Sequence, residues 1–412
     1  MLKKVVLNCG AKVLEALLNF EDGSSVGTRC ECGGEYINKR RSTKALQTVF
    51  GGVNLDRKRQ ECNRCGKGRV PKDIALGVVG TSFSPGLRRM MAKTGAEVCF
   101  DKAAEFIFEL AGQQVTDKEV ERVAEAVGGD IAKGEEAGIE GVMQEESGSE
   151  GNAQAPCTLY IATDGTGVPM VSKETEGRAG KGEDGIARTR EVKLGALFTQ
   201  SILDEKGNPV RDPHSTTYVG KIETSESFGP RLYAEALSRG LRGAKRKVVI
   251  GDGAQWVWNL AAFYFPDAIQ IVDYYHATEH LHTICKILFP ENERKRSACT
   301  CILKGLLWEG DIPSILSRLR RLRAHGKKKI ELEKELSYFE KNAHRMRYST
   351  FRNQGLFIGS GVVEAGCKSL IGGRLKRSGM HWSLRGANDI IALKCSIESG
   401  RFNSYWESRL AA

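Results

Sequence analysis

Short apolar runs and longer amphipathic stretches alternate along residues 157–290. Apolar runs rich in β-branched and aromatic residues predict strands, whereas apolar residues that recur every three or four positions predict helices. Strands are expected at CTLYIATD (157–164), REVKLGALFTQSIL (190–203), STTYVGKIE (215–223), KRKVVIGD (245–252) and AIQIV (268–272). Helices are expected at FGPRLYAEALSRGL (228–241), VWNLAAFYF (257–265) and after residue 273. Three strands followed by alternating helices and strands predict an α/β fold, with a mixed sheet and helices on both faces.

The chain on either side of this region follows other patterns. Residues 1–75 combine one helical stretch with short β-like runs, and residues 76–127 predict several helices, with Ser84, Asp101 and Thr116 as candidate N-caps. Residues 128–156 are acidic and rich in Gly, Glu and Ser without apolar periodicity, which predicts a linker. The expected domains are thus 1–75, 76–127, the linker 128–156, an α/β domain in two parts (157–290 and 349–412), and a basic helical insertion at 291–348.

The chain is basic, since 62 Lys and Arg residues outnumber 51 Asp and Glu residues and give a formal net charge of +11. This excess indicates a polyanionic partner, with nucleic acid as the leading candidate, although many mildly basic proteins have no such partner. No apolar run approaches the 18 residues of a membrane helix, and polar residues interrupt the N-terminal apolar stretch. We therefore expect a soluble, cytoplasmic protein with no membrane partner.

Four of the twelve cysteines form two close pairs, Cys30-x-Cys32 and Cys62-x-x-Cys65. Glycines flank both pairs, and thiolate pairs on such tight turns can close a tetrahedral, structural Zn²⁺ site. The second pair has the usual spacing, whereas the first is one residue short. The pattern predicts a zinc-ribbon-like module over residues 1–75, with incidental cysteines as the alternative.

The segment AAEFIFELAGQQVTDKEVERVAE (103–125) has the layout of a helix-turn-helix motif. An ordinary pair of packed helices fits the pattern almost equally well. The second helix carries more acidic than basic residues, which argues against its entry into a DNA groove.

Three carboxylates stand out by their context. Asp164 and Asp252 end predicted strands, and Glu364 begins a helix after Gly-Ser-Gly. Carboxylates at neighbouring strand ends meet at one sheet edge, and such a group can hold Mg²⁺ or Mn²⁺ as a pair of ions. The alternative is two Asp-Gly turns and a solvated glutamate. Other catalytic patterns are absent from the sequence: GDGAQW has Trp256 in place of the third glycine of a dinucleotide fingerprint, and no P-loop, G-x-S-x-G or H-E-x-x-H occurs.

Four longer strings resemble the Kra-type insertion-sequence transposases of the Mutator-like group of DDE transposases. They are IATDGTGVPM, IGDGAQWVWNLAAFYFPDAIQIVDYYHATEHL, IGSGVVEAGCKSLIGGRLKRSGMHW and RGANDIIALKCSIESGRFNSYWE, within residues 157–410. The resemblance implies an RNase H-like domain with a metal-binding triad at Asp164, Asp252 and Glu364. It also implies a D-x-x-H signature at Asp273 and His276, which would support the site or contact the scissile phosphate.

The resemblance further implies a Mg²⁺-dependent enzyme that cleaves and joins DNA, associates with the nucleoid, and forms a dimer or higher multimer on terminal inverted repeats and target DNA. Two alternatives are a structure-specific nuclease of the same fold and a catalytically silent DNA-binding regulator. Basic and aromatic residues near the predicted site are DNA-binding candidates, with a solvated helix face or a core position as the alternative for each: Arg318, Arg320, Arg321, Arg374, Lys376, Arg377, His381 and Trp382.

Overall fold

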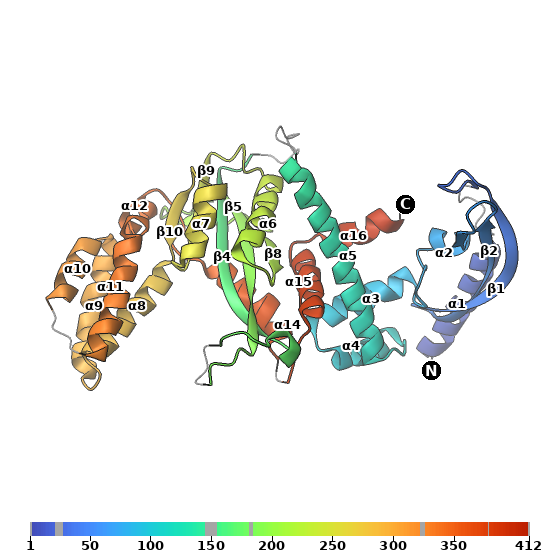
Figure 1. Cartoon of the computed structure of the whole chain (residues 1–412), viewed down its shortest axis with the longest axis horizontal. Helices are drawn as coiled ribbons and strands as arrows, with labels where there is room; N and C mark the ends of the chain where they lie inside the picture. Colours follow the sequence, from blue (N-terminus) through green and yellow to red (C-terminus); the bar gives the residue numbers. More distant parts are fainter. Residues whose placement is uncertain are drawn as a thin grey trace. The chain divides into compact units, whose positions relative to one another are not determined.

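The computed structural model describes residues 2–20, 28–144, 155–180, 184–321, 326–377 and 379–410 (Figure 1). The chain divides into two compact units, one formed by residues 1–133 and 388–412 and the other by residues 134–387. Residues 388–412 thus belong to the first unit, although the sequence analysis grouped them with the α/β domain. No helix among the described residues is long and apolar enough to cross a membrane.

The first unit begins with a helix on a small antiparallel sheet. Strands β1 (Tyr36–Thr48) and β2 (Gly51–Cys62) form a hairpin, and β3 (Gly68–Arg69) pairs with β2. Helix α1 (Leu2–Phe20) packs Ala11, Leu14 and Leu18 against the buried Val53 and Leu55 of the hairpin. The short helix α2 (Pro71–Ala75) follows β3.

Helices complete the first unit: α3 (Pro85–Glu97), α4 (Phe100–Phe106), the π-helical turn η1 (Ile107–Ala111), α5 (Asp117–Gln144), α15 (Leu384–Glu398) and α16 (Phe402–Leu410), of which α5 and α15 continue into the second unit. Ser84 caps α3 as predicted, because its hydroxyl accepts from the Leu87 backbone N–H at 3.3 Å. Thr116 and Glu119 form a capping box at the start of α5, with each side chain accepting from the other residue's backbone N–H. The helices predicted for residues 84–127 are therefore present, whereas Asp101 lies in the first turn of α4 rather than at its N-cap.

Helix α5 corrects the predicted linker, because residues 128–144 continue the helix. The glycines that suggested a loop instead permit close helix packing. A Cβ atom added to Gly128 would lie 1.9 Å from the backbone carbonyl oxygen of Asp389 on α15. Residues 145–154 of the predicted linker lie outside the described residues.

The second unit is built on a five-stranded mixed sheet in the order β10-β9-β4-β5-β8. Strand β4 pairs antiparallel with β5 and parallel with β9, while β5–β8 is antiparallel and β9–β10 is parallel. The predicted mixed α/β sheet is confirmed. Its strands are β4 (Thr158–Pro169), β5 (Thr189–Gln200), β8 (Thr217–Lys221), β9 (Arg246–Gly251) and β10 (Ile269–Val272), and β6 (Ile202–Leu203) with β7 (Pro209–Val210) forms a separate hairpin.

Helices cover both faces of this sheet. Adjacent residues of a strand point to opposite faces. On β5, Gly195 faces Leu232 of helix α6 (Ser225–Ser238), whereas Leu194 faces Gly366 of helix α13 (Gly361–Gly366). Helix α7 (Gln255–Tyr264) packs beside α6, and the 3-10 turn η2 (Ser172–Glu174) follows β4.

Strand β4 corrects the prediction that Asp164 ends a strand and starts a turn. The strand continues to Pro169, and Asp164 pairs with Leu194 of β5 inside the antiparallel ladder. The parallel ladder between β4 and β9 ends two residues earlier, at Ala162 and Ile250. Asp164 therefore lies where β4 and β9 separate while β5 still supports β4.

The predicted helical insertion is present and shares its core with the sheet. One cluster of buried residues contains Val248 and Ile271 of the sheet together with Leu307 and Phe339 of the insertion. In Figure 1 the insertion lies beside β10, at the edge of the sheet. The helices here are α8 (Tyr274–Leu288), α9 (Glu293–Glu309), α10 (Ile312–Arg320), α11 (Lys327–Asn342), η3 (Ala343–Arg345) and α12 (Tyr348–Asn353), and after α13 come the π-helical η4 (Cys367–Gly372) and α14 (Gly373–Leu375).

Candidate functional site

The four N-terminal cysteines form a compact cluster. The Sγ atoms of Cys30 and Cys65 are 3.6 Å apart, those of Cys32 and Cys62 are 3.5 Å apart, and all four lie within 4.8 Å of one another. Tetrahedral ligation with Zn–S bonds near 2.3 Å places sulfur atoms about 3.8 Å apart. The cluster could therefore hold zinc, and the short first pair does not prevent its closure.

Two tight turns bring these thiols together. In the first, the Cys30 N–H donates to the Gly34 carbonyl at 2.8 Å, and a Cβ at Gly34 would lie 2.7 Å from the Cys62 sulfur. In the second, the Gly66 N–H donates to the Cys62 carbonyl at 3.1 Å, with Gly66 at φ +73°. Hydrogen bonds from the Cys32 backbone N–H and the Tyr36 hydroxyl lower the pKa of Cys30 to about 6. A thiol with such a pKa supplies the thiolate that metals bind. The Gly34 backbone N–H likewise lowers the pKa of Cys32, but hydrogen bonds with the Cys65 and Cys62 thiols outweigh it and raise that pKa to about 12.

Asp164 and Asp252 lie at the ends of the parallel pairing between β4 and β9. The Gly165 N–H donates to Asp164 Oδ1 at 2.7 Å. Asp252 directly follows β9, and its Oδ1 accepts from the Ala254 N–H at 2.9 Å. The next residue, Gly253, has φ +99°, and a Cβ there would lie 2.5 Å from the Tyr338 ring. This bend fixes the Asp252 carboxylate beside the separating strands.

Glu364 comes from helix α13, which packs on β4 and β5. The Ser360 hydroxyl lies 3.3 Å from Glu364 Oε1, and the glutamate side chain remains 41% exposed. It is thus accessible to a ligand from solvent.

The carboxylates affect the pKa values of Asp164 and of the neighbouring Cys367. Burial raises the pKa of Asp164, and the negative charge of Asp252 raises it further, whereas a hydrogen bond from the Cys367 thiol lowers it. Burial raises the pKa of the Cys367 thiol, and the charges of Asp164 and Glu364 add to this effect. The carboxylates nevertheless remain apart, because among the described residues only the cysteine cluster brings three or more metal-ligand atoms within 4.8 Å of one another.

Asp273 is fully buried and acts as a structural connector. Its Oδ1 accepts from the His276 N–H at 2.7 Å at the start of α8, and its Oδ2 accepts from the Ser360 N–H. Asp273 therefore joins the start of α8 to the N-cap residue of α13, the helix that carries Glu364. The His276 ring is half-exposed, with Nδ1 3.5 Å from Glu279, and lies close enough to Asp164 for its charge to lower that pKa.

Two further histidines on α8, His280 and His282, lie in different environments. His280 Nδ1 lies 2.5 Å from a carboxylate oxygen of Glu335, and its ring stacks on Tyr338 at 3.7 Å. His282 is exposed and faces α9. The structure brings neither into the group of carboxylates.

The predicted DNA-binding residues near the carboxylates divide into two groups. Lys376, Arg377 and His381 are exposed, and the Lys376 ammonium donates to the Thr166 hydroxyl, two residues from Asp164 on the same strand. Arg374 and Trp382 are only 1% and 7% exposed, which corrects their prediction as DNA contacts. The Trp382 Nε1–H donates to the Leu375 carbonyl at 3.0 Å, because the chain after α14 returns to the end of β4 and buries this ring.

The three arginines predicted on the insertion are exposed on or just after α10. Arg320 forms an ion pair with Glu340 at 2.5 Å. Figure 1 shows α10 at the opposite side of the insertion from β4, so Arg318, Arg320 and Arg321 lie away from the carboxylates.

Three residues around the carboxylates were missed in the sequence analysis: Thr166, Ser360 and Cys367. The spacing of residues along a strand or helix predicts that two of them, Thr166 and Cys367, lie beside the carboxylates. Thr166 follows Asp164 by two positions, which places both on one face of a strand, and Cys367 follows Glu364 by three positions on a helical segment. Ser360 donates through both its N–H and its hydroxyl, and only the fold shows that these two groups connect Asp273 with Glu364.

Comparisons with known proteins yield little. No protein-family model and no curated protein matches the chain. Among solved structures, the chain is similar to the Drosophila P element transposase strand transfer complex, with a TM-score of 0.26 and 11% sequence identity over 82% of this chain and 83% of that chain. A likeness of this size does not establish a shared fold, so the function must be argued from the site itself.

Proposed function

We propose that this protein is a DNA transposase of the Kra-type, Mutator-like group, which cleaves the ends of an insertion sequence and joins the freed 3′-hydroxyl to target DNA. The observation that carries the proposal is that Asp164 and Asp252 lie where the neighbouring strands β4 and β9 separate, while helix α13, which carries Glu364, packs on β4 and β5. Asp164 comes from β4, Asp252 from the turn after β9 and Glu364 from α13, and the charges of all three meet around Asp164 and Cys367.

The sheet supports assignment of an RNase H-like fold. Three antiparallel strands, β4, β5 and β8, are followed by two strands parallel to β4, and a helical insertion separates the second Asp from the Glu. This is the arrangement that the sequence resemblance implies. Asp164 and Asp252 then lie on neighbouring strands at the edge where α/β sheets commonly bind ligands.

The donor set fits hard divalent cations. Asp164 is half-buried near the negative charge of Asp252, and a bound cation would offset both burial and repulsion. Asp164, Asp252 and Glu364 would hold one or two Mg²⁺ or Mn²⁺ ions. Such ions stabilise the attacking and leaving oxygens of a phosphoryl displacement. The ions and a DNA strand would draw the separated carboxylates together, since catalytic geometry often tightens only in the complex.

The surrounding residues hold and orient these groups. Asp273 and Ser360 fix the segment before Glu364. Lys376 and Arg377 provide exposed cations for DNA phosphates, and His381 provides an exposed imidazole that can form hydrogen bonds with them. We assign binding of the terminal repeats to the cysteine module and to the helices of residues 84–127. Two element ends must be brought together, so we expect a dimer or higher multimer.

Single substitutions test the triad. Asp164→Asn, Asp252→Asn and Glu364→Gln should each lower Mg²⁺-dependent cleavage of the flanking inverted repeats by about 10³-fold or more, because each removes a metal ligand. Affinity for the same DNA should stay within about threefold of wild type. Asp267→Asn, at an exposed ion pair with Lys247, is the matched control. A variant that retains Mg²⁺-dependent cleavage removes that residue from the triad.

A strand-transfer assay separates the proposal from its alternatives. A transposase joins pre-cleaved ends to target DNA, whereas a structure-specific nuclease cuts without joining. A regulator would bind the DNA without cutting it. Absence of joining by a protein that cleaves would therefore overturn the transposase assignment while leaving the carboxylate site in place.

A further inference from the structure

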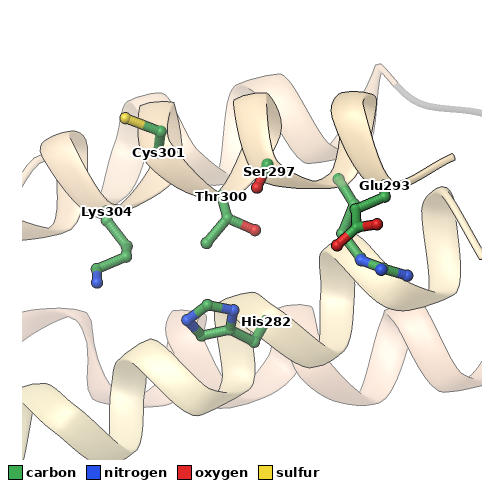
Figure 2. A pocket seen from close by; sticks show the side chains of 7 residues that line it. His282, Glu293, Ser297, Thr300, Cys301 and Lys304 are labelled. Atoms are coloured by element: carbon green, nitrogen blue, oxygen red, sulfur yellow. The ribbon is translucent and has the colours of Figure 1, made fainter.

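A pocket of about 360 Å³ opens between helices α8 and α9 in the insertion (Figure 2). We call it the α8–α9 pocket. His282 of α8 points across it toward α9. The other residues that line it all come from α9: Glu293, Arg296, Ser297, Thr300, Cys301 and Lys304.

The charges around the pocket favour an anion. Arg296 and Lys304 contribute two cations against the single carboxylate of Glu293. Within the described part of the chain, neither cation forms an ion pair, and Arg296 donates a long hydrogen bond of 3.4 Å to the Pro290 carbonyl. Both cations can therefore bind a ligand without breaking an internal ion pair.

Thr300 gives the pocket an unsatisfied polar group. The side chain is only 6% exposed, and its hydroxyl has no hydrogen-bond partner among the residues that the structure describes. Helical threonines commonly donate to the carbonyl four residues earlier, as Thr278 and Thr283 do on α8 at 2.9 and 3.1 Å. A buried hydroxyl without a partner destabilises the fold, so it requires an explanation in a native structure. Figure 2 shows Thr300 directed into the pocket toward His282.

We propose that the α8–α9 pocket binds a phosphate group of the DNA backbone. The Thr300 and Ser297 hydroxyls, the Lys304 ammonium and the Arg296 guanidinium supply the donors that a phosphate oxyanion accepts. That this phosphate belongs to DNA rests on the proposed function. That the pocket binds phosphate rests only on the residues that line it. Its location in the insertion makes it a second contact, separate from the cations beside β4.

A metal site is the competing explanation, since His282, Glu293 and Cys301 are all potential ligands. Their ligand atoms do not gather within 4.8 Å in the part of the chain that the structure describes. Two adjacent cations would also oppose a bound metal ion. The pocket therefore fits an anion better.

The first experiment measures binding of a 40-base-pair inverted-repeat duplex by fluorescence anisotropy over a range of salt concentrations. The double variant Arg296→Gln/Lys304→Gln should weaken binding about tenfold and reduce the salt slope by about one. Arg294→Gln/Lys295→Gln is the matched control, because it removes two exposed charges from the same helix outside the pocket. Equal losses for the two pairs would show general electrostatic attraction and overturn the pocket as a DNA contact.

The second experiment uses inorganic phosphate and does not depend on DNA. Phosphate at constant ionic strength should raise the Tm of the wild type more than chloride does, and it should not do so for the Arg296/Lys304 double variant. Thr300→Val should raise the Tm without phosphate, because it removes the unsatisfied hydroxyl, and should weaken the phosphate effect about threefold. If phosphate and the duplex both fail to distinguish the wild type from these variants, the pocket is no phosphate site.

The two arms separate the possible failures. If phosphate raises the Tm of the wild type but the wild type does not bind the duplex, the pocket is a phosphate site. The proposed function, and DNA as the ligand of the pocket, would then be rejected. DNA cleavage by the wild type with unaltered binding by every pocket variant would reject the pocket and retain the proposed function.

Discussion

The cysteine cluster and the carboxylate site contrast in how closely the protein brings its ligands together. Four sulfur atoms already lie within 4.8 Å, held by two tight turns that are joined by one hairpin. The carboxylates come from β4, the β9–α7 turn and α13, more than 80 residues apart in sequence at each step. Besides burial, the charge of Asp252 raises the pKa of Asp164, and the charges of Asp164 and Glu364 raise the pKa of Cys367. The three carboxylates nevertheless do not form a compact cluster among the described residues.

This difference has a physical reason. A structural metal site gains stability from ligands fixed by local turns, and its binding energy contributes to folding. Carboxylates kept close together without a cation repel one another and lose hydration. A group of carboxylates without a bound cation is therefore more stable in an open arrangement, with each carboxylate positioned by neighbouring hydrogen bonds.

Disruption of the cysteine cluster, which we predict to be a zinc site, should give the largest effect. Cys62→Ser, or a strong chelator, should unfold the region around residues 28–70, because structural zinc sites contribute about 10 kcal/mol or more to folding. Zinc content and limited proteolysis measure the result. Cys9→Ser, which changes an exposed thiol in the same unit, is the control. A zinc-free protein whose hairpin remains protected would show that the cysteines need no metal.

Loss of the buried connector should give the next largest effect. Asp273→Ala leaves the His276 and Ser360 N–H groups without their acceptor and should destabilise the second unit by about 3 kcal/mol. Urea unfolding followed by tryptophan fluorescence measures this change. Asp267→Ala, which breaks an exposed pair, should cost about 1 kcal/mol or less. If Asp273→Ala and Asp267→Ala lower the free energy of unfolding equally, Asp273 does not hold Ser360 at the start of α13.

The ionised Asp164 should reduce stability in the absence of divalent cations. Its folded-state pKa is raised above the ordinary 3.8, chiefly by burial, so the protonated form is favoured in the fold. The contribution of protonated Asp164 to the free energy of unfolding is fully present at pH values below its pKa in the unfolded state. This contribution is lost as the pH rises through its pKa in the folded state. Asp164→Asn should therefore raise the Tm by about 1–3 °C at pH 7, and the gain should disappear near pH 3. A destabilised variant in metal-free buffer at pH 7 would contradict this account.

The smallest effect concerns the thiol beside Asp164. Cys367→Ala removes a hydrogen-bond donor that lowers the pKa of Asp164, so that pKa should rise further. The change in stability should stay near 1 kcal/mol. Carboxyl ¹³C NMR titration of Asp164 measures the shift directly, and Cys367→Ser should restore most of it because a hydroxyl also donates. An unchanged titration in the alanine variant would exclude the thiol as a partner.

Local patterns in the sequence predicted the local structure. The caps at Thr116 and Ser84 and the strands of the sheet depend on residues near one another in the chain, and the structure contains all of them. The cysteine cluster was predictable for the same reason, because each half is a short turn between close residues. Its identity as a zinc site remains a prediction.

The errors arose where distant segments determine the outcome. The Asp164-Gly165 pair suggests a turn, but twelve consecutive pairings with β5 keep it in a strand. Gly128 suggests a loop, but close packing against Asp389 keeps it in a helix. Arg374 and Trp382 resembled DNA contacts until the chain after α14 folded back and buried them.

The shared core of sheet and insertion has a consequence for designing a shorter fragment of the protein. Tyr348 donates from α12 to the Val272 carbonyl at 3.0 Å, and both residues belong to the same buried cluster as Leu307 and Phe339. Deletion of residues 291–348 would remove one wall of that cluster and leave β10 exposed. The insertion is therefore not an independently removable domain. The shortest fragment that folds on its own must retain it.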